Sequence, residues 1–344
     1  MSNSSSGIAI GFELTRHCNL HCTHCLRNDT ATAEEIGLPL FKRILDEAKA
    51  YGHPWILLTG GEPTLHSEFF SVLDAIGERG YPCQLVTNGT TFTKMAARLR
   101  SHQDCLRTVT FSIDGAVEAT HDAIRGRGTF RKAIFALALA RHFGFRTALQ
   151  FVANKTNWHE IDLLPKLAQE LGAGILHVCH AQPSTGLYRA GQQLSPQEWR
   201  EIEGTVKRLA ETTDYVPPSM SVGRYAPGDI APCQTLRHRV LNIDYRGRLT
   251  FCCQFSNAGC GSDDIVGDLN KLSLSHAHRR LLKVIEQVVA ERVAGFSDGT
   301  FGELDGYHCW HCQKRFGKLE WMRNYQNDPW VKGEHGLANQ STIK

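Results

Sequence analysis

The sequence lacks the features of a membrane, exported or nucleic-acid-binding protein. It has no run of about 18 apolar residues, which a membrane-spanning helix needs. Its first residues, MSNSSSGIAIGFEL, lack the basic, apolar and small-residue zones of a signal peptide. Its 38 basic and 35 acidic residues are dispersed and give a formal net charge of only +3, which does not favour nucleic acid. We therefore expect a cytoplasmic protein that contacts neither membrane nor nucleic acid.

Cysteine, by contrast, is abundant, with 12 in 344 residues. In a reducing cytosol, closely spaced cysteines are more often metal ligands than disulfide partners. The tightest group is CNLHCTHC, which contains Cys18, Cys22 and Cys25, and no further cysteine follows until Cys83. Three thiols on one loop predict an iron–sulfur cluster with one open iron, because a four-thiolate site needs a fourth ligand nearby. The alternatives are buried thiols or a zinc site completed by a histidine of this loop: His17, His21 or His24.

Residues 8–195 alternate between short apolar segments and helical ones. Six β-prone segments, from IAIGFELT to ILHVCHA, alternate with stretches such as LPLFKRILDEAKAYG. Short strands that are apolar on both faces are typical of parallel sheets covered by helices. Six units are too few for a full eight-unit barrel, so we predict an α/β fold with a partial (β/α)6 barrel that resembles a TIM barrel. Ligands of such folds bind at the carboxyl ends of the strands, where the loop 18–25 follows the first strand.

The pattern changes after residue 195. Residues 196–230 are expected to form a helix and a linker rich in Pro, Gly and Ser, and residues 231–316 a small α+β domain. In that domain LNIDYRGRLTFCC has the alternation of a β-hairpin, and a basic helix is expected near residues 270–294. Four cysteines frame the domain: Cys233, Cys252, Cys309 and Cys312. Residues 317–344 are expected to pack their aromatic side chains on the surface as a C-terminal tail.

The first cysteine group and its surroundings resemble the radical S-adenosylmethionine (radical SAM) superfamily, whose signature spacing is C-x3-C-x2-C. The resemblance implies that Cys18, Cys22 and Cys25 bind a [4Fe–4S] cluster whose open iron is chelated by S-adenosylmethionine. LLTGGEPTLH resembles the family's glycine-rich turn after the second strand, where backbone groups meet the methionyl amine. Glycine allows such a close approach of backbone to ligand. The cofactor-binding residues implied in this turn are Gly60, Gly61, Glu62 and Pro63.

Two later segments also resemble the family and imply further cofactor contacts. VTNGT follows the third strand and contributes Asn88. TFSIDGAVEATHDAIRGRGTF accompanies the fourth strand, and in the family a serine and an arginine there commonly hold the carboxylate and ribose of the cofactor. The implied residues are Ser112, Asp114 and Arg125. Simple Asn-Gly and Asp-Gly turns are the alternative interpretation.

The spacing from Cys233 through Gly247 to Cys252 resembles the opening of a SPASM or twitch extension, in which a β-hairpin carries an auxiliary cluster. Only Cys309 and Cys312 follow at useful spacing, so the resemblance implies one auxiliary [4Fe–4S] cluster. A four-thiolate zinc site is the alternative.

Two cysteines compete with Cys252 for the second ligand position, namely Cys253 and Cys260. The spacing from Gly247 favours Cys252 as the ligand. Cys253 should then face the opposite side of the strand, because side chains alternate along a strand. A thiol that does not bind the cluster can return hydrogen to the substrate in an epimerase. The candidates for this catalytic role are Cys253 first, then Cys260 and Cys179.

The resemblance implies reductive cleavage of S-adenosylmethionine to a 5′-deoxyadenosyl radical that takes hydrogen from an unactivated carbon. The expected substrate is a ribosomally made peptide or protein-derived precursor, which is oxidised, cross-linked or epimerised. Few residues precede the first strand, which argues against an N-terminal leader-binding domain. A dehydrogenase or epimerase of an aminocyclitol or sugar is the second hypothesis. A reductant such as flavodoxin or ferredoxin is the expected partner. A non-catalytic iron–sulfur scaffold or electron carrier is the alternative of another class, and it would have no use for the GGEP turn.

Overall fold

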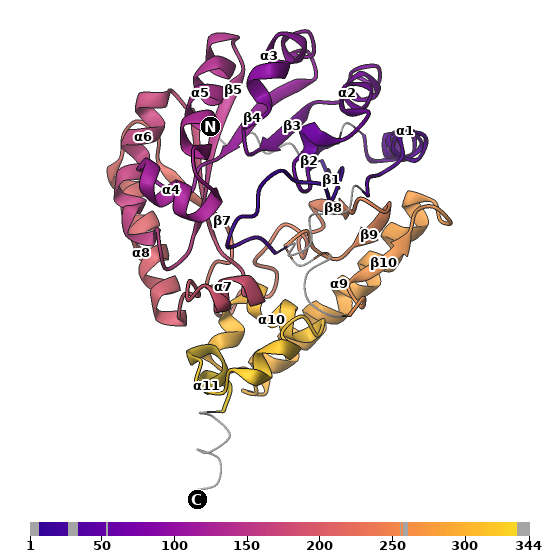
Figure 1. Cartoon of the computed structure of the whole chain (residues 1–344). Coiled ribbons are helices and arrows are strands. Elements are labelled where there is room, and N and C mark those ends of the chain that lie inside the picture. The colour runs from indigo at the N-terminus through magenta and orange to yellow at the C-terminus, as the bar shows by residue number, and fades with distance from the viewer. Residues whose placement is uncertain (1–6, 27–33, 53, 255, 257–260, 336–344) are drawn as a thin grey trace, which may run out of the picture.

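The computed structural model describes residues 7–26, 34–52, 54–254, 256 and 261–335. Over these ranges the strands form one curved sheet in the order β10-β9-β8-β1-β2-β3-β4-β5-β6-β7 (Figure 1). The six strands predicted from the sequence are present and pair in parallel with their neighbours. They are β1 Ala9–Glu13, β2 Trp55–Thr59, β3 Cys83–Thr87, β4 Leu106–Ser112, β5 Arg146–Ala153 and β6 Ile175–His180. The predicted α/β partial barrel is therefore confirmed.

Helices cover the outer side of these strands (Figure 1). In α1 (Leu38–Glu47) the apolar residues Phe41, Ile44 and Leu45 recur at helical spacing and are fully buried. The ring of Phe41 packs on Phe12 of β1 with a centroid distance of 4.6 Å. Burial of one such side chain contributes about 1.5–3 kcal/mol to stability, so this face fixes α1 against the sheet.

The other helices between the parallel strands follow the same pattern. The α-helices are α2 Phe69–Gly77, α3 Phe92–Arg100, α4 Glu118–Arg125, α5 Thr129–His142 and α6 Leu164–Leu171. The short 3-10 helices are η1 Ala48–Tyr51, η2 Pro63–Leu65 and η3 Trp158–Leu163. Helix α7 (Thr185–Arg189) follows β6.

The sheet continues beyond the six predicted strands. Helix α8 (Pro196–Thr212) begins at a capping box of Ser195 and Glu198 and is followed by β7 (Pro218–Val222), which pairs in parallel with β6. The segment predicted as a linker thus contains a strand. Its sequence, PSMSV, hides this because proline and serine disfavour strands, although proline is tolerated at the first residue of an edge strand.

The predicted β-hairpin is confirmed by β8 (Val240–Ile243) and β9 (Arg248–Thr250), which pair antiparallel. Gly247 in its turn has a φ of +73°, which glycine adopts without strain. Strand β8 also pairs in parallel with β1, and β10 (Ile265–Asp268) pairs antiparallel with β9. The hairpin therefore extends the sheet of the barrel.

The C-terminal helices are α9 Leu274–Ser297, η4 Glu303–Gly306, α10 His308–Arg315, η5 Glu320–Asn324 and α11 Pro329–His335. Of these, α9 packs beside β9 and β10, whereas α10 and α11 lie at the lower end of the molecule in Figure 1. None of the helices in the described ranges combines the length and apolar composition that crossing a lipid bilayer requires.

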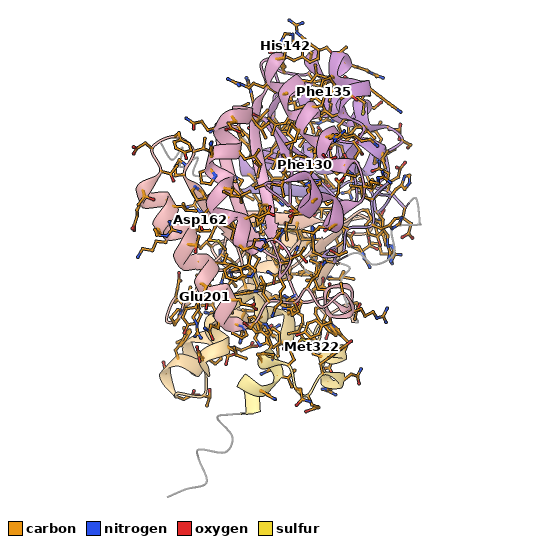
Figure 2. All side chains as sticks on the ribbon, turned by 60° about the vertical axis from the view of Figure 1, so that its left-hand side comes forward. Phe130, Phe135, His142, Asp162, Glu201 and Met322 are labelled. Atoms are coloured by element: carbon orange, nitrogen blue, oxygen red, sulfur yellow. The ribbon has the colours of Figure 1, made fainter. Side chains whose placement is uncertain are left out.

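The prediction of a surface tail is wrong for Trp330. Its side chain is fully buried, its ring stacks on Trp310 at a centroid distance of 4.5 Å, and its Nε1 donates to the Leu194 carbonyl at 2.7 Å. Met322, in the lower part of the molecule in Figure 2, is also buried. Part of the C-terminal segment therefore packs in the core, whereas Trp321 and Tyr325 are only half-buried.

Candidate active site

A cavity of about 210 Å³ lies at the carboxyl ends of the parallel strands. Its wall comes from the loops after β1, β2 and β3, from β4, β5 and β6, and from Gln254 beyond the hairpin. This is the edge where ligands of parallel α/β folds bind. The predicted site residues that line it are Cys18, Cys22, Cys25, Gly60, Gly61, Glu62, Asn88, Ser112 and Arg125. Two predicted residues, Pro63 and Asp114, are buried and do not line it.

The cysteine loop receives hydrogen bonds at its sulfur atoms. Cys18 Sγ accepts from the Leu20 backbone at 3.5 Å and from Asn88 Nδ2 at 3.9 Å. Cys22 Sγ accepts from Arg125 Nη1 at 3.9 Å. Burial raises the pKa of Cys22 to about 12, although the Arg125 charge opposes the rise. Thiolates bound to a metal centre would be stabilised by these N–H donors, so the set fits an iron–sulfur cluster.

The zinc alternative needs a histidine of this loop as a further ligand. Among the described residues no three Cys, His, Asp or Glu side chains converge as ligands of one metal ion. His24 Nε2, one of the proposed zinc ligands, instead contacts Asp114 Oδ2 at 2.6 Å.

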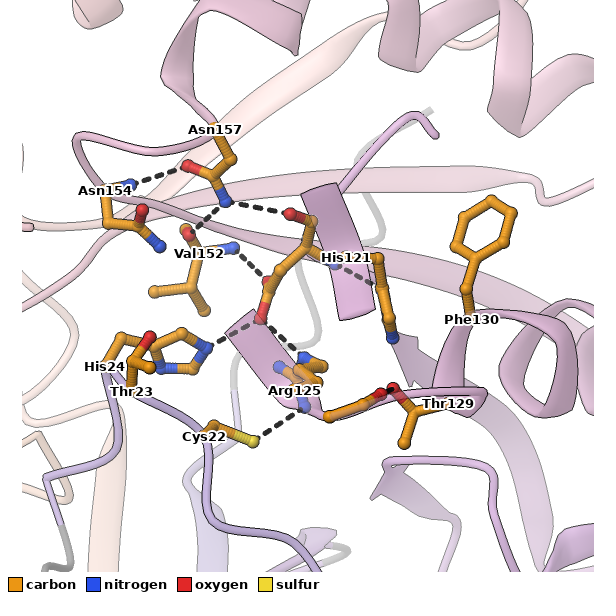
Figure 3. A network of polar contacts seen from close by, with 12 residues as sticks. Cys22, Thr23, His24, His121, Arg125, Thr129, Phe130, Val152, Asn154 and Asn157 are labelled. Atoms are coloured by element: carbon orange, nitrogen blue, oxygen red, sulfur yellow. Dashed lines mark hydrogen bonds and ion pairs between the residues drawn. The ribbon is translucent and has the colours of Figure 1, made fainter. Parts of the chain in front are cut away.

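Asp114 is the centre of a buried polar network, and Figure 3 labels its partners His24, Arg125, Val152 and Asn157. Its Oδ2 accepts from Arg125 Nε at 2.5 Å and contacts His24, and its Oδ1 accepts from the Val152 backbone at 2.8 Å. Burial would raise the pKa of Asp114, but Arg125 and His24 outweigh burial and hold it well below its usual range. Both carboxylate oxygens thus have partners inside the protein, and the contacts at Oδ2 hold Arg125 and His24, which line the cavity.

Two further side chains complete this network (Figure 3). Asn157 Nδ2 donates to the carbonyls of Asp114 and Val152, both at 3.0 Å. His121 Nδ1 accepts from the Asp114 backbone at 3.1 Å, and burial, followed by the Arg125 charge, lowers the pKa of His121 to about 4. His121 is therefore neutral near pH 7, and Arg125 and Asp114 are the charged pair.

The glycine turn after β2 is pressed against the start of the cysteine loop. A Cβ on Gly61 would lie 2.3 Å from the His17 carbonyl oxygen, and one on Gly60 2.6 Å from the Thr15 carbonyl oxygen. The Gly61 backbone N–H donates to the Thr15 carbonyl at 2.7 Å. The glycines thus permit a close approach of two backbones, beyond the approach to a ligand predicted from the sequence.

Glu62 ties the same turn to the end of β3. Its buried carboxylate accepts from Thr64 Oγ1 at 2.6 Å, from Thr87 Oγ1 at 2.8 Å and from the Asn88 backbone at 2.7 Å. Burial raises its pKa, whereas these hydrogen bonds lower it. Its carboxylate therefore positions Asn88, whose Nδ2 in turn reaches Cys18.

Gly61→Val is expected to lower both the iron bound by the cysteine loop and the affinity for S-adenosylmethionine. The reason is that the new side chain would displace the backbone at residues 16–17, directly before Cys18. Gly174→Val is the control, because a Cβ at Gly174 would meet nothing within 4 Å. Iron analysis and equilibrium binding measure the two effects. Full iron content in Gly61→Val would contradict this explanation of the turn.

The second cysteine set lies around helix α10. Cys309 and Cys312 are one helical turn apart and buried. Burial raises the pKa of both thiols, and the Cys233 thiol raises both further. For Cys252, a hydrogen bond with the Cys253 thiol raises the pKa first, then burial, with Cys309 and Cys233 among the further causes. These thiols therefore influence one another electrostatically, although they come from segments distant in sequence.

The structure changes the interpretation of Cys253. Strand β9 ends at Thr250, so Cys252 and Cys253 follow the strand and the alternation of faces does not separate them. Cys253 interacts with the thiol group around α10 and does not line the described cavity. Cys179 does line it, whereas Cys260 lies outside the described residues. A thiol that reacts with a substrate in this cavity is thus better placed at Cys179.

Sequence reasoning missed several residues at the cavity. His24 was considered only as a zinc ligand, and its place between two cysteines was the available signal. Gln182 lines the cavity and accepts from Gln313 Nε2 at 2.8 Å, beside Cys312 on α10. No local pattern marks this contact, because 131 residues separate the two glutamines.

Comparison with known proteins adds sequence and fold relatives. A profile of the radical SAM superfamily matches residues 12–167. An AdoMet-dependent heme synthase from Methanosarcina barkeri is 33% identical over 197 residues, 56% of this chain and 56% of that protein. The mycofactocin maturase MftC from Mycolicibacterium smegmatis is 32% identical over 179 residues, 52% of this chain and 45% of that protein. The chain thus matches about half the length of these relatives.

Two solved structures share the fold. Streptococcus suis SuiB bound to the precursor peptide SuiA has a TM-score of 0.63 at 15% identity, over 75% of this chain and 62% of SuiB. Native anSMEcpe with bound AdoMet and the Cp18Cys peptide has a TM-score of 0.64 at 16% identity, over 82% of this chain and 83% of anSMEcpe.

Proposed function

The chain belongs to the radical SAM superfamily, and we propose that it removes hydrogen from an unactivated carbon of a peptide or protein-derived precursor. The observation that carries this proposal is the cavity in which Cys18, Cys22 and Cys25 meet the glycine turn, Asn88 and Arg125. A bound [4Fe–4S] cluster with S-adenosylmethionine supplies one-electron chemistry that the side chains of a protein lack. We assign this chemistry to residues 8–195.

The residues of the chain bind and orient the reacting groups. Cys18, Cys22 and Cys25 are the proposed cluster ligands, and Asn88 and Arg125 donate to two of their sulfur atoms. Ser112, the glycine turn and the backbone around Asn88 remain the proposed contacts of S-adenosylmethionine, since they line the same cavity. Pro63 starts η2 and Asp114 orients Arg125, so we propose that both act by positioning.

The lining of the cavity favours a peptide over a tetrapyrrole. Three glutamine side chains, Gln150, Gln182 and Gln254, line it, and an amide can both donate to and accept from peptide groups. A tetrapyrrole precursor of haem is the second candidate because of the identity to the heme synthase. Its several carboxylates need cations, yet Arg125 is the sole lysine or arginine among the described lining residues and already donates to Asp114.

We further propose that residues 231–316 carry one auxiliary [4Fe–4S] cluster on Cys233, Cys252, Cys309 and Cys312. The mutual electrostatic influence of these thiols, of which Cys309 and Cys312 are buried, supports this assignment, as does the confirmed hairpin that precedes Cys252. The role proposed for this cluster is to accept the electron left on the substrate after hydrogen removal. A small electron-transfer protein such as flavodoxin or ferredoxin is the proposed reductant.

Cys309→Ala is expected to lower the iron content by up to about four atoms per chain and to leave cleavage of S-adenosylmethionine intact. Product formation should be lost, because hydrogen removal and electron acceptance are assigned to different cysteine groups. Cys105→Ala is the control, since this buried thiol lies just before β4 and outside both groups. Iron analysis and chromatography of deoxyadenosine and product measure the effects. Unchanged iron in Cys309→Ala would rule out this residue as a ligand.

The proposed function is tested with protein reconstituted without oxygen and supplied with S-adenosylmethionine and dithionite. Three substrates are compared: a peptide encoded beside the gene, an iron porphyrin with free carboxylates and an aminocyclitol. Mass spectrometry should show a change in the peptide alone, with deoxyadenosine formed in proportion. Conversion of the porphyrin or the aminocyclitol with an unchanged peptide would refute the peptide class.

A further inference from the structure

Arg292 is a buried cation without a charged partner in the described structure. It lies on α9, has no measurable exposure, and forms no ion pair among the residues that the structure describes. Its Nη2 donates to the Asp229 carbonyl at 2.8 Å and its Nη1 to the Asp305 carbonyl at 3.4 Å. Its Nε has no hydrogen-bond partner. A buried charge is unfavourable unless an opposite charge lies nearby, so this arginine requires an explanation.

The nearest carboxylates are engaged elsewhere. Asp229 Oδ2 pairs with Arg237 at 3.2 Å, and Asp305 Oδ1 contacts His311 at 3.1 Å. Backbone carbonyls therefore fix the position of Arg292, and Asp229 and Asp305, whose charges favour its protonated form, also interact with Arg237 and His311. A further negative charge close to Arg292 would therefore be favourable.

The proposed auxiliary ligands lie near this guanidinium. Arg292 interacts electrostatically with Cys233 and Cys312, whose sulfur atoms would be anionic when bound to a cluster. Its two backbone partners, Asp229 and Asp305, each lie four residues before a proposed ligand, Cys233 or Cys309. The contacts of Arg292 thus connect three segments around the thiol group: α9, the segment before Cys233 and the segment before α10.

The other arginine of this region does not compete for this role. Arg315 lies on the same helix as Cys312 but is partly exposed and pairs through Nε with Glu291 at 2.6 Å. Water and Glu291 screen Arg315, whereas Arg292 is fully buried and has no carboxylate of the described residues within ion-pair distance.

We propose that Arg292 is the internal counter-charge of the auxiliary iron–sulfur cluster and sets its reduction potential. The inference rests on the auxiliary cluster of the proposed function. Reduction adds one electron to a cluster whose thiolates are already negative, and a fixed buried cation favours the more negative state. Arg292 is therefore a tuning residue, and it touches neither the substrate nor the first cavity.

The test uses the full chain with Cys18, Cys22 and Cys25 changed to alanine, so that only the auxiliary cluster is present. Three variants are compared in this background: Arg292→Met, Arg292→Lys and the control Arg315→Met. Potentiometric titration followed by electron paramagnetic resonance should show a more negative midpoint potential in Arg292→Met. Arg292→Lys, which keeps the charge, and Arg315→Met, which removes a screened charge, should stay near the parent protein. Equal midpoint potentials in Arg292→Met and the parent would overturn the proposal.

A second measurement separates tuning from a structural role. In cluster-free protein, Arg292→Met and Arg292→Lys both lose the guanidinium hydrogen bonds to the Asp229 and Asp305 carbonyls, so both are expected to unfold at a lower temperature than the parent. A midpoint potential that falls equally in both variants would make Arg292 a structural residue and overturn the proposal. Absence of iron from the parent protein itself would refute the auxiliary cluster, and this result is seen before any Arg292 variant is compared.

Discussion

Changing Cys18, Cys22 and Cys25 together to alanine is expected to lower the iron content from about eight to about four atoms per chain. Formation of deoxyadenosine under dithionite should stop completely. The reason is that the structure brings these three thiols to one cavity wall, with N–H donors at two of their sulfur atoms. Iron analysis and chromatography of the nucleoside measure both effects.

Cys83→Ala is the matched control for this experiment. Cys83 is a fully buried thiol at the start of β3, at the opposite end of that strand from the cavity. Its loss should leave iron content and cleavage unchanged. Stoichiometric zinc in the wild-type protein would contradict the cluster assignment at once.

Arg125→Met is expected to lower the free energy of unfolding of the cluster-free protein by about 3–5 kcal/mol. The change leaves the fully buried carboxylate of Asp114 without the guanidinium that lies 2.5 Å from it. Urea unfolding at neutral pH measures the effect. The control is Arg131→Met: this arginine is 79% exposed and pairs with Glu118, so its loss should cost less than about 1 kcal/mol.

The effect of Arg125→Met should also depend on pH. The folded pKa of Asp114 lies below the unfolded value of about 3.9, so the pair stabilises the protein above that pH. This stability is lost as the pH falls below that value, because the carboxyl takes up a proton. The difference between wild type and variant should therefore shrink below about pH 4. A difference that stays constant into the acid range would show that Arg125 acts by packing alone.

Six strands of the barrel could be predicted because each is short, apolar and followed by a helix. Strand β7 could not be predicted, because its sequence PSMSV contains proline and serine, which disfavour strands, although the segment pairs with β6. The burial of Trp330 was equally hidden: it depends on Trp310 and on the Leu194 carbonyl, which only the folded chain brings near. Local sequence reports the pattern of a segment, whereas these outcomes depend on partners distant in sequence.

The candidate site also has features that the sequence predicted and features that it could not predict. Spacing was sufficient to place the three cysteines and the glycine turn at one cavity. Spacing could not tell that the carboxylate of Asp114 faces inward to Arg125, or that a Cβ on Gly61 would meet the His17 carbonyl. The direction of the Asp114 side chain and the close approach at Gly61 both depend on which side of a loop faces the neighbouring segment. A one-residue change of register would turn the other side toward that segment.

Strand β1 has a consequence for how the chain is made. It is an interior strand: Ala9 pairs with Trp55 on one side and with Val240 on the other. A ribosome adds about 5–20 residues per second, so roughly 10–50 s separate the synthesis of Ala9 from that of Val240. During this interval one edge of β1 has unpaired N–H and C=O groups and can pair with another chain. Nascent chains that stall before β8 are therefore prone to edge-to-edge aggregation, and slower expression with chaperone support should raise the yield of folded protein.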